Sequence, residues 1–147
     1  MSSEQWVIVR LEAHEFALPL ARVIEVLRMV AMEPVPEAPA WLAGLVNLRG
    51  RALPVMDPRA RLGLPPRAPG LNTRLIVVEA GGSWLGLLAD EVTEVLTQNA
   101  APIDLPDESA GAPSHNYRAV LVGARLVSIL ELDRLSHAVE SQAPRPA

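Results

Sequence analysis

Few side chains in this sequence could catalyse a reaction or bind a metal, and their spacing suits neither task. The histidines are His14, His115 and His137; no two have the spacing of metal ligands, and none lies beside a serine that it could activate. There is no cysteine, which excludes disulfides, thiolate metal sites and cysteine nucleophiles. We therefore expect no enzymatic activity, no metal and no cofactor, and interpret the chain as a binding module.

Two adjacent acids are the other candidates for chemistry. Asp90 and Glu91 could form an acid–base pair, but neighbouring residues on a strand or turn normally point apart. We interpret them as a solvated turn before the apolar stretch that begins at Val92. Hydrolysis by unrecognised carboxylates is the remaining catalytic alternative, and no motif supports it.

The thirteen basic residues are all arginine, and their distribution is uneven. A net charge of −4 argues against nucleic-acid binding, so a nucleic-acid-binding barrel is the weakest alternative from another class. Between residues 49 and 74, a single acid, Asp57, accompanies six arginines: Arg49, Arg51, Arg59, Arg61, Arg67 and Arg74. This local excess could bind an acidic partner or lie on a solvated face.

Short segments of alternating apolar residues predict an all-β chain with short helices. We expect ten strands, at residues 6–12, 16–20, 23–29, 45–48, 51–55, 74–80, 84–88, 92–97, 118–122 and 125–131. The predicted helices are one turn at 40–44, a short helix opened by Asp57 and Pro58 and ended by Gly63, and a terminal helix from Asp133. Residues 34–39 form an extended connector, and residues 99–116 a long polar loop.

The second half of the chain repeats the first. An offset of 69 places WVIVRL (6–11) on LIVVEA (75–80) and FALPLARVIEVL (16–27) on LGLLADEVTEVL (85–96), so that Glu25 falls on Glu94. A slightly larger offset places LRGRALPVMD (48–57) on LVGARLVSILE (121–131). Three matches in the same order indicate an internal duplication, with five short strands in each half closed into a small barrel.

We expect a single domain of two subdomains. Subdomain 1 covers about residues 6–64, the linker 65–72, and subdomain 2 about 73–136; residues 137–147 complete a helix and a flexible tail. No apolar run approaches the roughly 20 residues of a membrane span, and the polar start is not a signal peptide, which favours a cytoplasmic location.

Three segments resemble CheW, the coupling protein of bacterial chemosensory arrays. They are FALPLARVIEVLRM, PVPEAPAWLAGLVNLRGRALPVMDPRARLGL and TRLIVVEAGGSWLGLLADEVTEVL, and the likeness runs from about Trp6 to Leu135. The resemblance implies two packed five-stranded SH3-like barrels without catalytic activity. It further implies an adaptor that binds the helical cytoplasmic tip of a chemoreceptor in a groove between the barrels, and couples it to the regulatory domain of a CheA-type histidine kinase.

The same resemblance implies the receptor-binding residues, which are Val23, Ile24, Glu25, Val26, Asn47 and Arg49. It names no kinase-binding residues in this chain. Several residues have structural alternatives: Val23 could belong to a barrel core, Glu25 could pair internally with an arginine, and Asn47 and Arg49 could stabilise their own turn. Asp57 is expected to cap a helix rather than to contact a partner.

The last hairpin departs from the family pattern. The segment YRAVLVGARLVSILE (117–131) lacks about two residues, and Ala119 stands near a position where the family has glycine. In the resembling proteins both barrels can meet partner barrels end to end, including other CheW-like proteins. A shortened hairpin suggests an alternative function, an accessory protein that binds receptor but couples weakly to the kinase.

Overall fold

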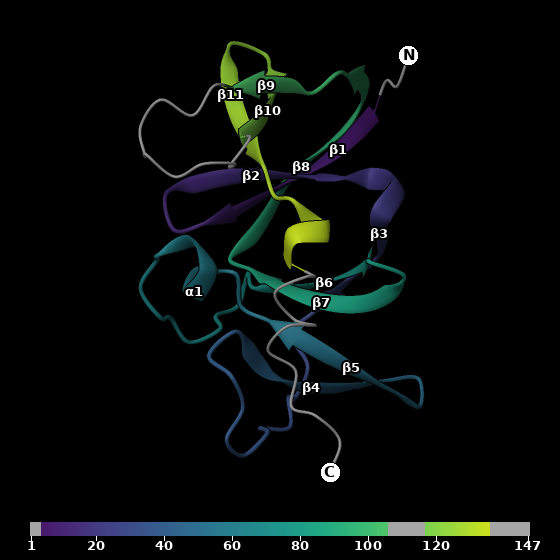
Figure 1. The fold of residues 1–147 in the computed structure, drawn as a ribbon, viewed down its shortest axis with the longest axis vertical. Coiled ribbons are helices and arrows are strands. Elements are labelled where there is room, and N and C mark those ends of the chain that lie inside the picture. Colours follow the sequence, from purple (N-terminus) through teal and green to yellow (C-terminus); the bar gives the residue numbers. More distant parts are fainter. Residues whose placement is uncertain (1–3, 106–116, 136–147) are drawn as a thin grey trace.

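The computed structural model describes residues 4–105 and 117–135, which form two β-sheets with short helices (Figure 1). The first half of the chain contains β1 (Glu4–Leu11), β2 (His14–Pro19), the 3₁₀ turn η1 (Leu20–Arg22), β3 (Val23–Arg28), β4 (Leu42–Leu48), β5 (Arg51–Met56) and α1 (Arg59–Leu62). The second half contains β6 (Arg74–Ala80), β7 (Ser83–Ala89), β8 (Glu91–Ala100), β9 (Ile103–Leu105), β10 (Tyr117–Val122) and β11 (Arg125–Ile129). The predicted all-β class is confirmed.

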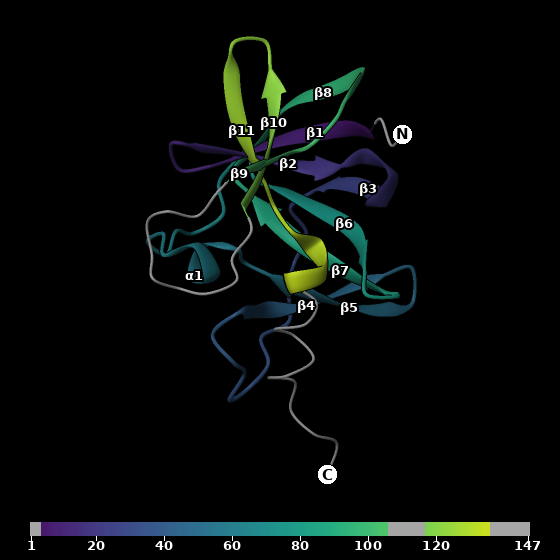
Figure 2. The same ribbon diagram turned by 45° about the horizontal axis from the view of Figure 1, so that its top comes forward.

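The two halves of the chain exchange strands. The six-stranded sheet has the order β8-β1-β2-β11-β10-β9 and the five-stranded sheet the order β3-β6-β7-β5-β4, with all neighbours antiparallel except β11–β2 and β5–β7. Each sheet therefore combines a hairpin from one half with strands from the other, and β9 is added to the six-stranded sheet. Figure 2 shows the β10–β11 hairpin projecting above β1 and β2, far from β4 and β5 of the other sheet.

The division into residues 6–64 and 73–136 is therefore not the division between the sheets. Pro19 and η1 end the first hairpin and redirect the chain, so β3 pairs with β6 instead of continuing beside β2. The same exchange occurs after β7, where β8 leaves its own hairpin and pairs with β1. The duplication survives this exchange, because β3, β6, β7, β5 and β4 take the places that β8, β1, β2, β11 and β10 take in the other sheet.

Two strands, β1 and β6, are buried on both faces, which explains their uninterrupted apolar sequences. In β1, Trp6 and Ile8 point into the core of the six-stranded sheet, whereas Val7 and Val9 join the apolar layer between the sheets. In β6, the residues at an offset of 69 divide in the same way: Leu75 and Val77 point into the core of the five-stranded sheet, and Ile76 and Val78 into the shared layer. The described residues thus form three apolar clusters, one inside each sheet and one between the sheets.

The five-stranded sheet closes into a barrel through the segment that follows β3. Glu33 and Leu45 exchange both backbone hydrogen bonds, at 2.8 and 2.9 Å, which joins this segment to β4 at the opposite edge. Gly44 permits the contact, because a Cβ atom there would lie 2.9 Å from the carbonyl oxygen of Glu33. Closure leaves fewer unpaired backbone groups at the sheet edges.

Local predictions were correct for most elements and wrong for two segments. Residues 42–44 form the start of β4, not a helical turn, because Leu42 pairs with Met56 on β5. Part of the predicted loop 99–116 is strand, since β8 continues to Ala100 and β9 pairs with β10. The terminal helix is present at residues 132–135, whereas residues 106–116 and the predicted tail at 137–147 lie outside the described part. No helix in the described ranges has the length and apolar character that a membrane crossing requires.

A buried arginine connects α1 to both sheets. Arg59 is only 4% exposed, and its guanidinium donates to both carboxylate oxygens of Asp90, at 2.9 and 2.6 Å, and to Glu12, at 2.7 Å. Glu12 lies in the β1–β2 turn, and Asp90 lies where the chain crosses from the five-stranded to the six-stranded sheet. The N-cap residue of this short helix is Pro58, one residue later than predicted, and Asp57 just before it accepts a hydrogen bond from the Arg59 N–H at 3.1 Å. Asp90 is therefore part of a buried ion cluster, not of a solvated turn.

We predict that Arg59→Met lowers the free energy of unfolding by about 3–5 kcal/mol, because the largely buried Asp90 would lose its closest cationic partner. Arg67, at 3.5 Å, and Arg10, at 4.0 Å, approach Asp90 less closely and replace only part of this interaction. The matched control is Arg61→Met, which removes an exposed arginine from the same helix and should change stability by no more than about 0.5 kcal/mol. Urea unfolding followed by circular dichroism measures both variants. Equal losses for the two would show that the cluster does not hold the fold together.

Candidate functional site

The outward face of β3 carries exposed apolar side chains. Ile24 and Val26 are 41% and 43% exposed, and Val30, just beyond the strand, is also exposed. The alternate residues point inward: Val23 packs against the layer between the sheets, and Leu27 against the core of the five-stranded barrel. Of the residues assigned to a receptor site, Ile24 and Val26 are thus on the surface, whereas Val23 contributes mainly to packing.

The β4–β5 turn brings Arg49 to the inward-facing side of β3. Arg49 and Gly50 both have left-handed backbone conformations, with φ of 49° and 86°, and the Gly50 N–H donates to the side-chain oxygen of Asn47 at 2.8 Å. Arg49 Nη2 and Nη1 donate to the two carboxylate oxygens of Glu25. Two of the structural alternatives that the sequence offered are present here, namely the internal pair of Glu25 and the turn role of Asn47.

An arginine is an unusual residue for this turn. The left-handed region costs a non-glycine residue roughly 1–2 kcal/mol, and type I′ hairpins prefer asparagine or glycine. A residue in a strained backbone conformation at a surface position points to a role for its side chain. Here the hydrogen bond to Glu25 raises the pKa of Arg49 above its ordinary value. The guanidinium is charged at physiological pH with or without this partner.

The other barrel has an equivalent ion pair. Glu94, which the offset of 69 places on Glu25, accepts a hydrogen bond from Arg125 at 2.9 Å. Arg125 also donates to Glu15 at 2.8 Å, and the bonds to Glu15 and Glu94 raise its pKa. In both barrels a carboxylate on β3 or β8 thus meets an arginine from a hairpin of the same barrel.

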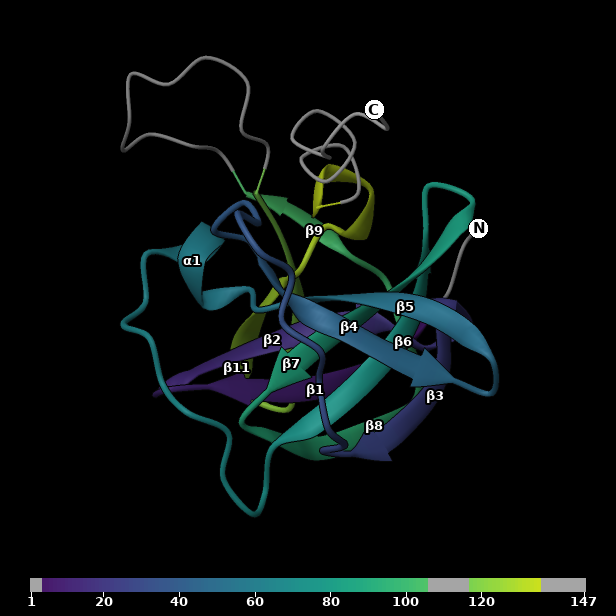
Figure 3. The ribbon, with the colours of Figure 1, turned by 90° about the horizontal axis from the view of Figure 1, so that it is seen from below.

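Val95 is an exposed residue that was not predicted from the sequence. It is 53% exposed on β8, and the offset of 69 places it on Val26, so the duplication contained the signal that could have identified it. β3 pairs with β6 and β8 with β1, and β1 and β6 form the layer between the sheets. Val26 and Val95 therefore lie on strands that are direct neighbours of this layer. Figure 3 shows β3 and β8 on the side of the molecule away from α1.

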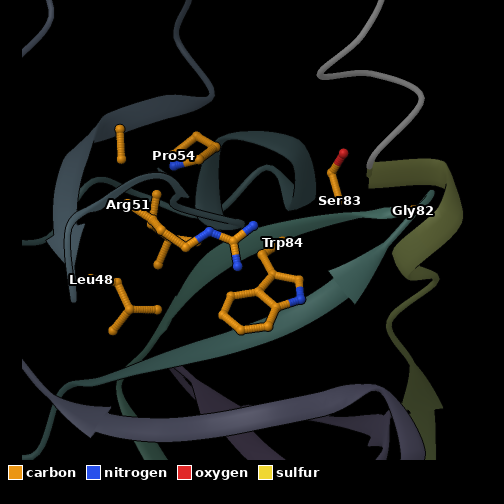
Figure 4. Close-up of a pocket in the computed structure, with 8 residues that line it drawn as sticks. Leu48, Arg51, Pro54, Gly82, Ser83 and Trp84 are labelled. Carbon is orange, nitrogen blue, oxygen red and sulfur yellow. The ribbon is translucent and has the colours of Figure 1, made fainter.

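A cavity of about 420 Å³ opens beside the β4–β5 hairpin and the β6–β7 turn (Figure 4). The Arg51 guanidinium lies 4.6 Å from the centre of the Trp84 ring, in a cation–π contact that fixes its position. Leu48 and Pro54 line the same cavity. This cavity belongs to the barrel that carries Arg49, but it contains no carboxylate or histidine.

The arrangement is suited to recognition rather than to acid–base or metal chemistry. Within residues 4–105 and 117–135, no three histidine or acidic side chains are grouped in a way that could hold a metal ion. Glu25 on β3 is paired with Arg49, and the exposed neighbours Ile24 and Val26 are apolar. His115 and His137 lie outside the described residues.

Comparisons with known proteins agree with this interpretation. Residues 5–140 match the family model of the CheW-like domain. The chemotaxis protein CheW of Rhizobium meliloti is 32% identical over 136 residues, which are 91% of this chain and 88% of that protein. Protein FrzA of Myxococcus xanthus is 27% identical over 86% of this chain and 81% of its own length. The crystal structure of the scaffolding protein TtCheW from Thermoanaerobacter tengcongensis superimposes with a TM-score of 0.78 at 27% identity, covering 91% of this chain and 92% of that one.

The left-handed conformation of Arg49 can be tested by two substitutions at this position. Arg49→Ala and Arg49→Gly both remove the exposed ion pair with Glu25, so its loss affects the two variants equally. Only glycine also relieves the backbone strain, so we expect R49G to be more stable than R49A by about 1 kcal/mol in chemical unfolding. Equal stabilities would contradict a left-handed residue at this turn.

Proposed function

The chain belongs to the CheW-like domain family, and from this premise we propose that it is a non-catalytic adaptor that links a chemoreceptor to a CheA-type histidine kinase. The adaptor would work in the cytoplasm at receptor arrays, where it binds the helical cytoplasmic tip of a receptor. A scaffolding role agrees with the family and with the structural relative. The observation that carries the receptor contact is the row of exposed apolar side chains at Ile24, Val26 and Val30.

An apolar row on a rigid strand suits helix recognition. A helix presents its apolar residues at intervals of three and four, and it buries them against a matching apolar surface on its partner. The row on β3 is held by the barrel, so little conformational entropy is lost on binding. Val95 on β8 extends the proposed receptor surface to the other barrel, across the layer between the two sheets. This agrees with a receptor groove between the barrels.

Arg49 can serve the receptor while it remains paired with Glu25. A guanidinium has five N–H donors, and only the two terminal nitrogens each contribute one bond to Glu25. Because the Arg49 side chain is 66% exposed, the remaining donors can reach a carbonyl or carboxylate at the receptor tip. Glu25 would then orient the arginine, and Asn47 would hold the turn that presents it.

The proposed kinase contact involves the barrel that contains the β10–β11 hairpin. This hairpin has a two-residue turn, because Val122 pairs with Arg125. Leu121 and Leu126 are opposite each other in the hairpin and are both more than half exposed, at 52% and 57%. They offer an apolar contact to a partner barrel despite the short turn.

We predict that Arg49→Ala weakens binding of a receptor signalling fragment by about 1–3 kcal/mol, the contribution of a charge-assisted hydrogen bond. Isothermal titration calorimetry of purified protein and fragment measures the dissociation constant. Glu25→Gln separates two explanations: if the arginine contacts the receptor directly, this variant loses only the orientation of Arg49 and should lose less affinity than Arg49→Ala. An equal loss for both variants would show that the pair only positions β3.

We predict that Val26→Asp folds normally but loses most of its affinity for the receptor fragment, because a carboxylate would have to be buried against the receptor helix. Leu126→Asp is the matched control, a similar change at an exposed site on the other barrel. Melting curves verify folding, and calorimetry compares affinities. Unchanged receptor binding by Val26→Asp would remove β3 from the proposed site.

One experiment tests the adaptor role as a whole. Parallel pull-downs should show that the chain captures both a receptor signalling fragment and the regulatory domain of CheA, and that Leu126→Asp reduces capture of the kinase domain alone. Capture of the receptor without the kinase would instead support the accessory function. Failure to capture either partner would refute the proposal.

A further inference from the structure

A second surface groove follows the seam between the parallel strands β2 and β11. One cavity of about 280 Å³ and a second of about 340 Å³ share Phe16 and Ser128 as lining residues. These two residues are register partners across the seam. The two adjoining cavities are here called the seam groove, which follows β2 and β11 and reaches α1 through Arg61 and Leu62. Figure 1 shows the strands and the helix that border it.

The deeper end of the seam groove is apolar. Phe16 and Leu62 are half-buried at its wall, and Leu135 is buried there. Leu62 comes from α1 and Leu135 from the helix at 132–135, so residues of both halves of the chain form this end. Its volume is at the lower limit of small-molecule pockets, which are typically about 300–1,000 Å³, and suits a single anchoring side chain better than a whole ligand.

The rim of this end has uncompensated positive charge. Three arginines line it, and one of them, Arg118, is neutralised by a bidentate pair with Glu131 at 2.7 and 3.1 Å. Arg61 and Arg134 are exposed and have no carboxylate partner among the described residues. At the other end of the groove, Glu15 is already paired with Arg125 and offers little repulsion to an incoming anion.

Among the six arginines of the segment 49–74, Arg61 is the one whose side chain has no partner among the described residues. Arg49 pairs with Glu25, Arg51 stacks on Trp84 and Arg59 is buried against Asp90. Arg67 approaches Glu12 and Asp90, and Arg74 donates to two backbone carbonyls. Arg61 is free to bind a group from outside the described part of the chain.

We propose that the seam groove docks an acidic segment of a partner protein. One large apolar side chain of that segment enters between Phe16, Leu62 and Leu135, and flanking carboxylates bind Arg61 and Arg134. A central apolar anchor surrounded by polar bonds is the usual composition of an energetic hot spot. The groove lies on the α1 side of the molecule, opposite the proposed receptor surface on β3, so both sites can be occupied together (Figure 3). This inference does not depend on the adaptor role.

The test uses a short blocked peptide, acetyl-Glu-Glu-Leu-Phe-Glu-Glu-amide, as the probe of this chemistry. Titration into the ¹⁵N-labelled full chain should give saturable shifts of the backbone amides of Phe16, Ser128 and Leu135. Two further peptides test the two parts of the contact: one has glutamine in place of every glutamate, and the other has alanine in place of leucine and phenylalanine. Both should bind at least about tenfold more weakly, because each loses one class of contact.

Variants of the chain test the arginines. The double variant Arg61→Gln with Arg134→Gln should weaken binding of the acidic peptide by about tenfold or more. The control, Arg28→Gln with Arg51→Gln, makes the same change in net charge away from the groove and should change affinity by less than about twofold. Both doubles should melt within a few degrees of the unmodified chain, since these side chains are exposed.

Several results would overturn the proposal. These are absence of saturable binding, equal binding of the glutamine peptide, or shifts confined to β3 and β8. A fourth possibility is that this chain's own acids fill the groove, since Asp107 and Glu108 lie in the segment between β9 and β10. In that case Asp107→Asn with Glu108→Gln would shift the Phe16 and Ser128 amides without any peptide. The receptor and kinase pull-downs are independent of all these outcomes, so the two proposals can fail separately.

Discussion

The architecture depends on burying β1 and β6 on both faces. One face of each strand fills its own sheet, with Trp6 as the largest side chain, and the other face fills the layer between the sheets. A polar residue at any of these central positions would be buried without a partner, at a cost of several kcal/mol. The same requirement fixes the register of both strands, because a slip by one residue would exchange their two apolar faces. The relative position of the barrels, and hence of every surface site, follows from this shared layer.

Charge is arranged around that apolar framework in two different ways. Buried charge is structural: Arg59 holds Asp90 and Glu12 where α1 meets both sheets, and it is inaccessible to partners. Exposed charge lies at the hairpins, where the Glu25–Arg49 pair of one barrel has a counterpart in the Glu94–Arg125 pair of the other. Surface pairs of this type add little stability, so their value lies in orienting the arginine.

The surfaces proposed for partners are separated by the barrels themselves. Apolar side chains on β3 and β8 occupy one side, the seam groove next to α1 occupies another, and the β10–β11 hairpin projects from the end of the six-stranded sheet. A small rigid domain with distinct binding faces can hold several partners at once without a large conformational change. This is the mechanical property that a scaffold requires.

The sequence by itself determined most of the strands, the duplication and the turn at Arg49, because alternating apolar residues, repetition and the position of glycine are local signals. It missed β9 and the start of β4. It identified Glu25 and Arg49 as candidates and left open the pairing that the structure shows. The exchange of hairpins, the burial of Arg59 and the exposure of Val95 were decided by tertiary structure alone. The reason is physical. An alternating pattern of apolar and polar residues indicates that a strand has two different faces, but the neighbours that cover each face come from segments that are distant in the chain.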